Sequence, residues 1–224
     1  MSCLIPVHGS NSMSDARLDD AAIHHSAPDS GPAVLVIIDM FSTFDTEQTA
    51  PFFKQARTVA RRIAGLRERT AKVGMPTIFA NDNYGRWRSD ARQIMHDAAR
   101  SPQGKEIVEL LEPNSDDYLV LKPKHSIFYA TPLDVLLKYL GTHTLILTGM
   151  TATQCVLFSG IEAMIRDYRL FVPLDCVVSQ NARERRLAKY LFETRLKADT
   201  RAASRLRLPS LRRRAQARAK ASRK

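Results

Sequence analysis

The residues best suited to chemistry lie in the stretch Thr144–Val156, TLILTGMTATQCV. An apolar run leads to Gly149, small residues follow, and Cys155 stands where a helix is expected to begin. A cysteine in the first turn of a helix lies at the positive end of the helix dipole, which favours the thiolate. Free backbone N–H groups in such a turn can also hold an oxyanion. The spacing fits a nucleophile and a small buried residue about equally well, since most free cysteines are buried.

Charged residues end two other apolar runs in the same way. Asp39 ends VLVIID, and Lys122 ends DYLVLK. Each has an ordinary alternative, because an acid at a strand end can cap a helix and a lysine there is usually exposed. A carboxylate, an ammonium group and a thiol that converge at strand ends would instead form an activated nucleophile. Asp39, Lys122 and Cys155 are therefore the candidate catalytic residues.

The elements that must position these residues follow a regular alternation. Apolar runs predict strands at 33–39, 77–81, 117–122, 144–149 and 170–177, with a short sixth strand near 200–203. Helical periodicity predicts helices at 52–72, 90–100, 104–111, 132–140, 153–167 and 183–197. Strands that are apolar throughout indicate a parallel sheet covered on both faces. The predicted fold is α/β, three-layer α-β-α, around a six-stranded, mostly parallel sheet of Rossmann-like strand order.

In such sheets ligands bind beyond the carboxyl ends of the strands, where the strand order reverses. The chemistry is therefore expected at the strand ends that carry Asp39, Asn81-Asp82, Lys122, Gly149–Cys155 and Asp175. The sequence contains no G-x-G-x-x-G and no Walker-type loop, so a nucleotide cofactor has no support.

Positive charge is concentrated near the C-terminal end. The formal net charge is +11, yet residues 1–200 carry 24 basic and 23 acidic side chains, a net of +1. Residues 201–224 hold the other 10 Lys and Arg and no acid. We predict an unstructured lead-in at 1–32, one domain at 33–208 and a basic tail at 209–224. We interpret the tail as solvated, with nonspecific affinity; the alternative is a helical or disordered arm that contacts nucleic acid, membrane lipid or an acidic partner.

Cysteine usage and hydropathy bear on the compartment. The three cysteines, Cys3, Cys155 and Cys176, are widely spaced, which argues against a disulfide framework and for a reducing environment. No apolar run approaches the ~20 residues of a membrane helix, and the first residues lack the basic region of a signal peptide. These features predict a cytoplasmic protein. Cys176, inside a predicted strand, is expected in the core.

Taken together, these segments resemble the isochorismatase-like cysteine hydrolase superfamily, which includes nicotinamidases, N-carbamoylsarcosine amidase, and maleamate and ureidoacrylate amidohydrolases. The resemblance runs from about Ala33 to about Leu208. Its first motif is Asp39 with Phe44, and its third is GMTATQCV with Cys155. The second motif has the pattern K-x-x-x-S-x-F before a T-x-L helix start, and it matches Lys122, Ser126, Phe128, Thr131 and Leu133.

The resemblance implies a Cys–Asp–Lys triad. Asp39 would take the thiol proton of Cys155, Lys122 would lower the thiol pKa, and the thiolate would attack a carbonyl to form an acyl-enzyme that water cleaves. It further implies an oxyanion hole from the backbone N–H groups of Thr151 and Cys155, and a cis peptide bond between Met150 and Thr151. The implied substrate is a small amide, ureide or carbamoyl compound, and the implied assembly is a dimer or tetramer.

The chain also departs from relatives in this superfamily. Nicotinamidases hold a metal through a D-x-H…H cluster after the second strand, whereas position 84 here is Tyr84 beside Asp82, so no metal and no other cofactor is expected. True isochorismatases lack the nucleophilic cysteine, so vinyl-ether hydrolysis is an alternative, as is a non-catalytic member that binds a partner through its basic tail. His125 is assigned only a role in loop shape. The candidate substrate-pocket residues, with a surface loop as the alternative, are Phe44, Asn81, Tyr84, Arg86 and Trp87.

Overall fold

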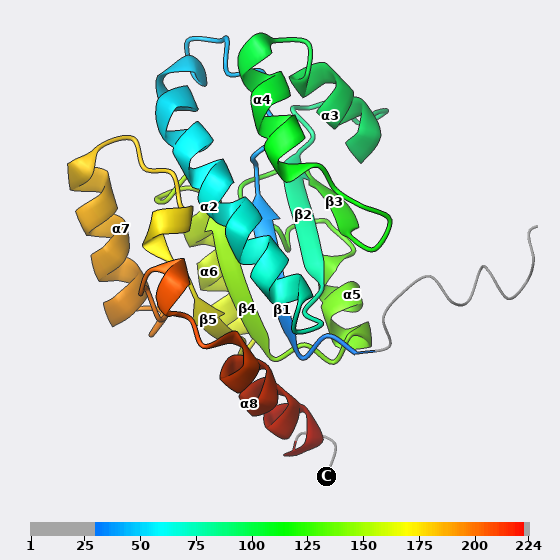
Figure 1. The fold of residues 1–224 in the computed structure, drawn as a ribbon, viewed down its shortest axis with the longest axis vertical. Coiled ribbons are helices and arrows are strands. Elements are labelled where there is room, and N and C mark those ends of the chain that lie inside the picture. Colours follow the sequence, from blue (N-terminus) through cyan, green and yellow to red (C-terminus); the bar gives the residue numbers. More distant parts are fainter. Residues whose placement is uncertain (1–29, 222–224) are drawn as a thin grey trace, which may run out of the picture.

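A parallel sheet forms the centre of the computed structural model, which describes residues 30–221 (Figure 1). The strand order is β3-β2-β1-β4-β5, and every neighbouring pair is parallel. The predicted α/β class with a parallel sheet is therefore confirmed. Most of the predicted lead-in at 1–32 lies outside the described residues. The strands are β1 (Ala33–Ile38), β2 (Thr77–Asp82), β3 (Tyr118–Lys122), β4 (Thr144–Gly149) and β5 (Arg169–Phe171).

Helices cover both faces of the sheet. On one face lie α2 (Phe53–Ala71), which follows the short 3-10 helix η1 (Ala50–Phe52), then α3 (Ala91–Ala98), α4 (Pro102–Leu111) and α8 (Leu208–Ala221). On the other face lie α5 (Leu133–Tyr139), α6 (Cys155–Ile165) and α7 (Ala182–Thr194). Among residues 30–221, no helix combines the length and the apolar character needed to cross a membrane.

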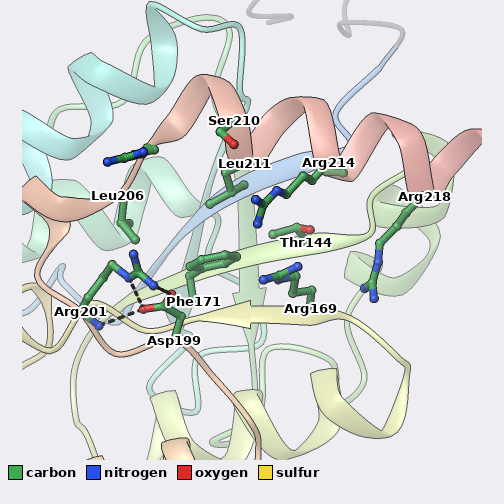
Figure 2. A pocket seen from close by; sticks show the side chains of 12 residues that line it. Thr144, Arg169, Phe171, Asp199, Arg201, Leu206, Ser210, Leu211, Arg214 and Arg218 are labelled. Atoms are coloured by element: carbon green, nitrogen blue, oxygen red, sulfur yellow. Dashed lines mark hydrogen bonds and ion pairs between the residues drawn. The ribbon is translucent and has the colours of Figure 1, made fainter.

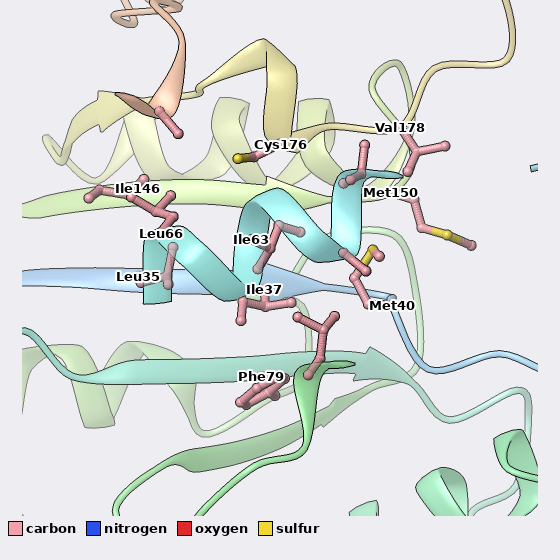
Figure 3. Packing of buried hydrophobic residues seen from close by; sticks show 14 of the residues in the cluster. Leu35, Ile37, Met40, Ile63, Leu66, Phe79, Ile146, Met150, Cys176 and Val178 are labelled. Carbon is pink, nitrogen blue, oxygen red and sulfur yellow. The ribbon is translucent and has the colours of Figure 1, made fainter. Parts of the chain in front are cut away.

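The sheet separates two hydrophobic cores, and β1 contributes to both. Leu35 and Ile37 face the core beneath α2, where they pack with Ile63 and Leu66 (Figure 3). The alternate residues of β1, among them Val36, face the core beneath α5, α6 and α7. A strand buried on both faces needs apolar side chains at every position, which explains the unbroken run AVLVII.

The sheet has five strands, so the predicted sixth strand near 200–203 is wrong. The chain does reach the edge of β5, where Val172 N–H donates to Asp199 O at 2.8 Å and Asp199 pairs with Phe171 as an isolated bridge. It then leaves the edge, because Ala203 N–H donates to the Asp175 carboxylate at 2.8 Å and opens the 3-10 helix η3 (Ala203–Arg205). A side-chain acceptor thus replaces the strand partner that a sixth strand would need.

The fifth strand is also shorter than the predicted 170–177. It stops at Phe171, and Pro173 precedes the 3-10 helix η2 (Leu174–Cys176). Proline has no N–H to donate to a neighbouring strand. Pairing resumes only at Val177, which bridges to Gly149 at the end of β4. Cys176 lies in the core beneath α2, as expected.

The basic C-terminal segment continues the fold past the predicted domain end at residue 208. Helix α8 takes up most of 209–224, and three of its residues, Leu208, Leu211 and Ala215, are buried in the core beneath α2. Their spacing of three and four residues places them on one face of a helix. The segment that we interpret as a solvated tail from its sequence is therefore an amphipathic helix over residues 208–221.

Two glycine substitutions test the packing. The N–H of Gly104 donates to Ser101 Oγ at the start of α4, and a Cβ at Gly104 would lie 2.0 Å from Ala98 O and 2.5 Å from Ser42 O. Gly104→Ala should lower the free energy of unfolding by about 1–3 kcal/mol or more. The matched control is Gly65→Ala inside α2, where a Cβ meets nothing within 4 Å and helix propensity predicts a gain of up to ~1 kcal/mol. Urea denaturation measures both, and equal effects of the two substitutions would contradict the packing at α4.

Candidate active site

Asp39 is placed by the end of β1, directly after Ile38. Its N–H donates to Ala80 O at 2.9 Å, and its φ of +54° turns the chain out of the sheet. Asp tolerates this left-handed conformation better than most residues because its short side chain can bond locally. The Asp39 carboxylate accepts a hydrogen bond from the backbone N–H of Asp82 at 2.7 Å, and the residue is 6% exposed. The carboxylate is thus fixed over the carboxyl ends of β1 and β2.

Lys122 reaches Asp39 across an intervening strand. Lys122 ends β3, which lies beside β2, whereas Asp39 follows β1 on the far side of β2. Strands are ~4.8 Å apart, so a long side chain is needed to cover the distance. Lys122 Nζ lies 2.8 Å from Asp39 Oδ2, donates to Lys124 O at 3.1 Å, and is fully buried.

Cys155 completes the cluster from the other side of β1. It is the first residue of α6, which follows β4, and it is 9% exposed. Its sulfur lies 3.5 Å from Lys122 Nζ. The sheet order reverses between β1 and β4, so the structure brings Asp39, Lys122 and Cys155 together at the switch point.

The turn before Cys155 is held tightly to β1. Gly149 has φ +107°, and a Cβ there would lie 2.0 Å from Ile38 O, so only glycine fits. Met150 N–H donates to Ile38 O at 2.9 Å, and the peptide bond between Met150 and Thr151 is cis, at the bond where the resemblance places one. Cys155 opens α6, so its N–H is among those of the first helical turn that lack an intrahelical acceptor.

The three titratable groups perturb one another. Burial raises the pKa of Asp39 above 3.8, although Lys122 acts in the opposite direction. Burial acts to lower the pKa of Lys122, but the Asp39 carboxylate and Cys155 outweigh it and raise that pKa above 10.5. Burial and the Asp39 carboxylate raise the pKa of the Cys155 thiol to about 12, more than Lys122 lowers it. This direction argues against the resting thiolate expected from the sequence, because burial, together with the Asp39 carboxylate, outweighs the ammonium group.

Two further polar side chains meet the cluster. Asp82 Oδ2 lies 3.5 Å from Lys122 Nζ. His125 Nδ1 lies 3.6 Å from Cys155 Sγ. His125 also lies against Phe158 of α6, with ring centroids 5.5 Å apart. The sequence indicates only a role in loop shape for His125. His125 follows Lys122 by three residues, in the loop that leads away from the end of β3. This closeness to a candidate catalytic residue is the signal that could have identified His125 as a neighbour of Cys155.

The predicted pocket residues do not act as one group. Asn81 accepts from Phe41 N–H at 3.0 Å and donates to Phe41 O at 3.2 Å, so it holds the loop after β1. Phe44 is 1% exposed and packs on Phe53, and it belongs to the core. Trp87 is 78% exposed, so its ring lies at the protein surface.

Tyr84 and Arg86 do line a cavity, of about 360 Å³, beside the loop after β1. The Tyr84 hydroxyl donates to Phe41 O at 2.8 Å, two residues past Asp39. Arg86 forms an ion pair with Asp97 across the same cavity, which neutralises the charge that a carboxylate clamp would use. The same segment offers little to a metal ion: Asp82 Oδ1 accepts from Tyr84 N–H at 2.6 Å while Oδ2 faces Lys122. Within residues 30–221, no three His, Cys, Asp or Glu side chains gather in a metal-binding arrangement.

Comparisons with known proteins show the family of the chain. A family model described as an isochorismatase domain matches residues 33–197. The uncharacterized isochorismatase family protein YaaI of Bacillus subtilis (strain 168) is 32% identical over 165 residues, covering 74% of this chain and 91% of that protein. Ureidoacrylate amidohydrolase RutB of Methylorubrum extorquens is 27% identical, covering 62% of this chain and 64% of that protein. The crystal structure of N-carbamoylsarcosine amidase from Thermoplasma acidophilum superposes with a TM-score of 0.63 at 25% identity, covering 78% and 98% of the two chains.

The Lys122–Asp39 pair can be tested by stability alone. Lys122→Met removes the cation and leaves the Asp39 carboxylate buried, so the free energy of unfolding at neutral pH should fall by about 3–5 kcal/mol. The double variant Lys122→Met/Asp39→Asn leaves no buried charge on either residue and should lose less than the single variant. Urea denaturation of the wild type, the two single variants Lys122→Met and Asp39→Asn, and the double variant completes a double-mutant cycle. Losses that simply add in the double variant would show that the two groups are uncoupled.

Proposed function

The chain belongs to the isochorismatase family, and we propose that it is a cysteine hydrolase that cleaves a carbon–nitrogen bond in a small amide, ureide or carbamoyl compound. The observation that supports this proposal most is the position of Lys122 Nζ, 2.8 Å from the Asp39 carboxylate and 3.5 Å from the Cys155 sulfur. Base, cation and nucleophile thus share one buried cluster, which is the arrangement that activates a weak nucleophile.

The proposed first step moves one proton within the cluster. At rest the thiol is neutral, and the Asp39 carboxylate and Lys122 ammonium balance each other. When substrate arrives, the Cys155 proton passes to Asp39 and the sulfur attacks the carbonyl carbon. The cluster still carries no net charge after the transfer, because the thiolate now balances Lys122. The raised pKa values of Asp39 and of the thiol favour this exchange over ionisation toward solvent.

The later steps return that proton. The carbonyl oxygen becomes an oxyanion, for which we propose the backbone N–H groups of Thr151 and Cys155 as donors. Collapse of the tetrahedral intermediate breaks the C–N bond, and the proton on Asp39 passes to the departing nitrogen. A thioester to Cys155 remains. Water then loses a proton to Asp39 and attacks the thioester carbonyl, which releases the acid and restores the thiol.

We propose that these steps need no metal ion. Both oxygens of Asp82, the acid expected at a metal position, already face Lys122 and the Tyr84 N–H. The oxyanion donors are backbone groups, so the reaction asks for no Lewis acid.

A nucleophile variant tests the proposal directly. A panel of small amides, ureides and carbamoyl compounds should include one that releases ammonia, and Cys155→Ala should reduce that turnover by at least about 10³-fold. The control Cys176→Ala, a buried cysteine in the other core, should retain turnover if it folds. Thermal unfolding of each variant checks the fold. Full activity in Cys155→Ala would refute the nucleophile, and an inactive wild type across the panel would favour the non-catalytic alternative.

The pH profile tests the role of Asp39. A base must be deprotonated, and burial raises the pKa of Asp39, so the fall of kcat/KM at acid pH should have its midpoint above the ordinary carboxyl value of 3.8. Lys122 must stay protonated, and its pKa lies above 10.5, so no alkaline loss is expected below about pH 10. Steady-state kinetics on the substrate found in the panel measures both limbs. An acid limb at or below the ordinary carboxyl value would contradict a buried base.

A further inference from the structure

A second cavity lies between α8 and the edge of the sheet, away from the triad (Figure 2). It has a volume of about 310 Å³. Its polar lining is dominated by guanidinium groups from three separate segments: β5, the stretch after α7, and α8. The arginines that line it are Arg169, Arg201, Arg207, Arg214 and Arg218.

Basic side chains outnumber acidic ones in the lining of this cavity. Asp199 is the single acidic residue that lines it, against five arginines. Asp199 is already bound to Arg201, with an Oδ2–Nη2 distance of 2.8 Å. Within residues 30–221, Arg169, Arg207 and Arg214 form no ion pair with an acidic side chain. Gathering these cations in one cavity costs electrostatic energy that a bound anion would relieve.

The helix that carries two of these exposed arginines is anchored by buried neighbours. Leu211 and Ala215, on the cavity side of α8, are 8% and 1% exposed and fix the helix to the sheet. Arg214 and Arg218 lie one turn apart, so both extend from the same face of α8. Across the cavity, the Arg169 guanidinium lies over Phe171, with its central carbon 5.4 Å from the ring centroid. Guanidinium groups therefore face the cavity from both walls, as Figure 2 shows for Arg169 and Arg214.

The cavity lies at the opposite end of the sheet from the triad. Thr144 and Arg169, the first residues of β4 and β5, line it, whereas Cys155 follows the carboxyl end of β4. The length of β4 separates the two sites by roughly 17 Å, at ~3.3 Å per residue. A ligand here would not occupy the space of the hydrolysed bond.

We propose that this arginine-lined cavity binds a small molecule that carries several clustered phosphate groups. A guanidinium group can donate two parallel hydrogen bonds to phosphate oxygens. Arg169, Arg207 and Arg214 have no acidic partner among the described residues, which favours an anion with several phosphate groups over a single carboxylate. A nucleic-acid strand fits less well. Arginines on two facing walls enclose a compact anion, and the aromatic residue of the lining, Phe171, is 8% exposed and offers little surface for base stacking.

Equilibrium binding to the full chain tests the proposal without any need for turnover. Inorganic tripolyphosphate, titrated by calorimetry in 150 mM salt, should bind with saturation at one site. Arg214→Gln and Arg169→Gln should each weaken binding at least about tenfold, because each removes a charge-assisted hydrogen bond. The matched control is Arg213→Gln, which changes the net charge equally at an exposed α8 residue that does not line the cavity. It should change the affinity less than twofold.

Two comparison ligands complete the experiment. Citrate tests whether clustered carboxylates suffice, and a short single-stranded RNA tests a nucleic-acid surface. Tighter binding of tripolyphosphate than of either, with the loss confined to the two lining variants, supports the proposal. The proposal is overturned if tripolyphosphate does not bind, if Arg213→Gln loses as much affinity as the two lining variants, or if citrate binds more tightly. It is also overturned if the RNA binds more tightly than tripolyphosphate and all three substitutions weaken that binding equally.

Discussion

The buried ion pair between Lys122 and Asp39 constrains the rest of the site. A fully buried ammonium group is costly unless a counter-charge meets it, and the Asp39 carboxylate does so at 2.8 Å. This requirement links the ends of β1 and β3 across β2, which the Asp82 N–H ties to the same carboxylate. The edge strand β3 must therefore end in register with β2, and the loop after β1 must turn at Asp39. The position of the sulfur beside this pair follows from the tight turn at Gly149.

The sequence predicted much of this arrangement, because strand ends are visible as the limits of apolar runs. Asp39, Lys122 and Cys155 lie at or just beyond such limits, and the rule for parallel sheets places them at one edge. The sequence could not predict which of several possible hydrogen-bond acceptors or nearby charges would act most strongly on a given group. The predicted sixth strand does not form, because the Ala203 N–H donates to the Asp175 side chain instead of to a neighbouring strand. The thiol pKa depended on distances to Asp39 and Lys122 that no spacing encodes.

The C-terminal segment shows a different limit. Its many basic residues favour a solvated tail when the sequence is considered alone. The small apolar set of Leu208, Leu211 and Ala215 has helical spacing, and it is these residues that join α8 to the core. Once the helix is fixed, its arginines are no longer a diffuse charge. They occupy defined positions against β5 and the stretch after α7, and this is what separates a binding cavity from nonspecific attraction.

In the proposed mechanism, charge balance reconciles the burial of Cys155 with its role as the nucleophile. A thiol with a pKa of about 12 is a poor nucleophile in its resting form. The same burial that suppresses ionisation also raises the pKa of the Asp39 carboxyl, which makes this carboxylate a stronger base toward the thiol than an ordinary carboxylate would be. Because the Lys122 charge is balanced in both states, the proton transfer creates no new buried net charge. Such a thiol would remain inert toward solvent electrophiles and become nucleophilic only while a carbonyl group lies within reach of its sulfur.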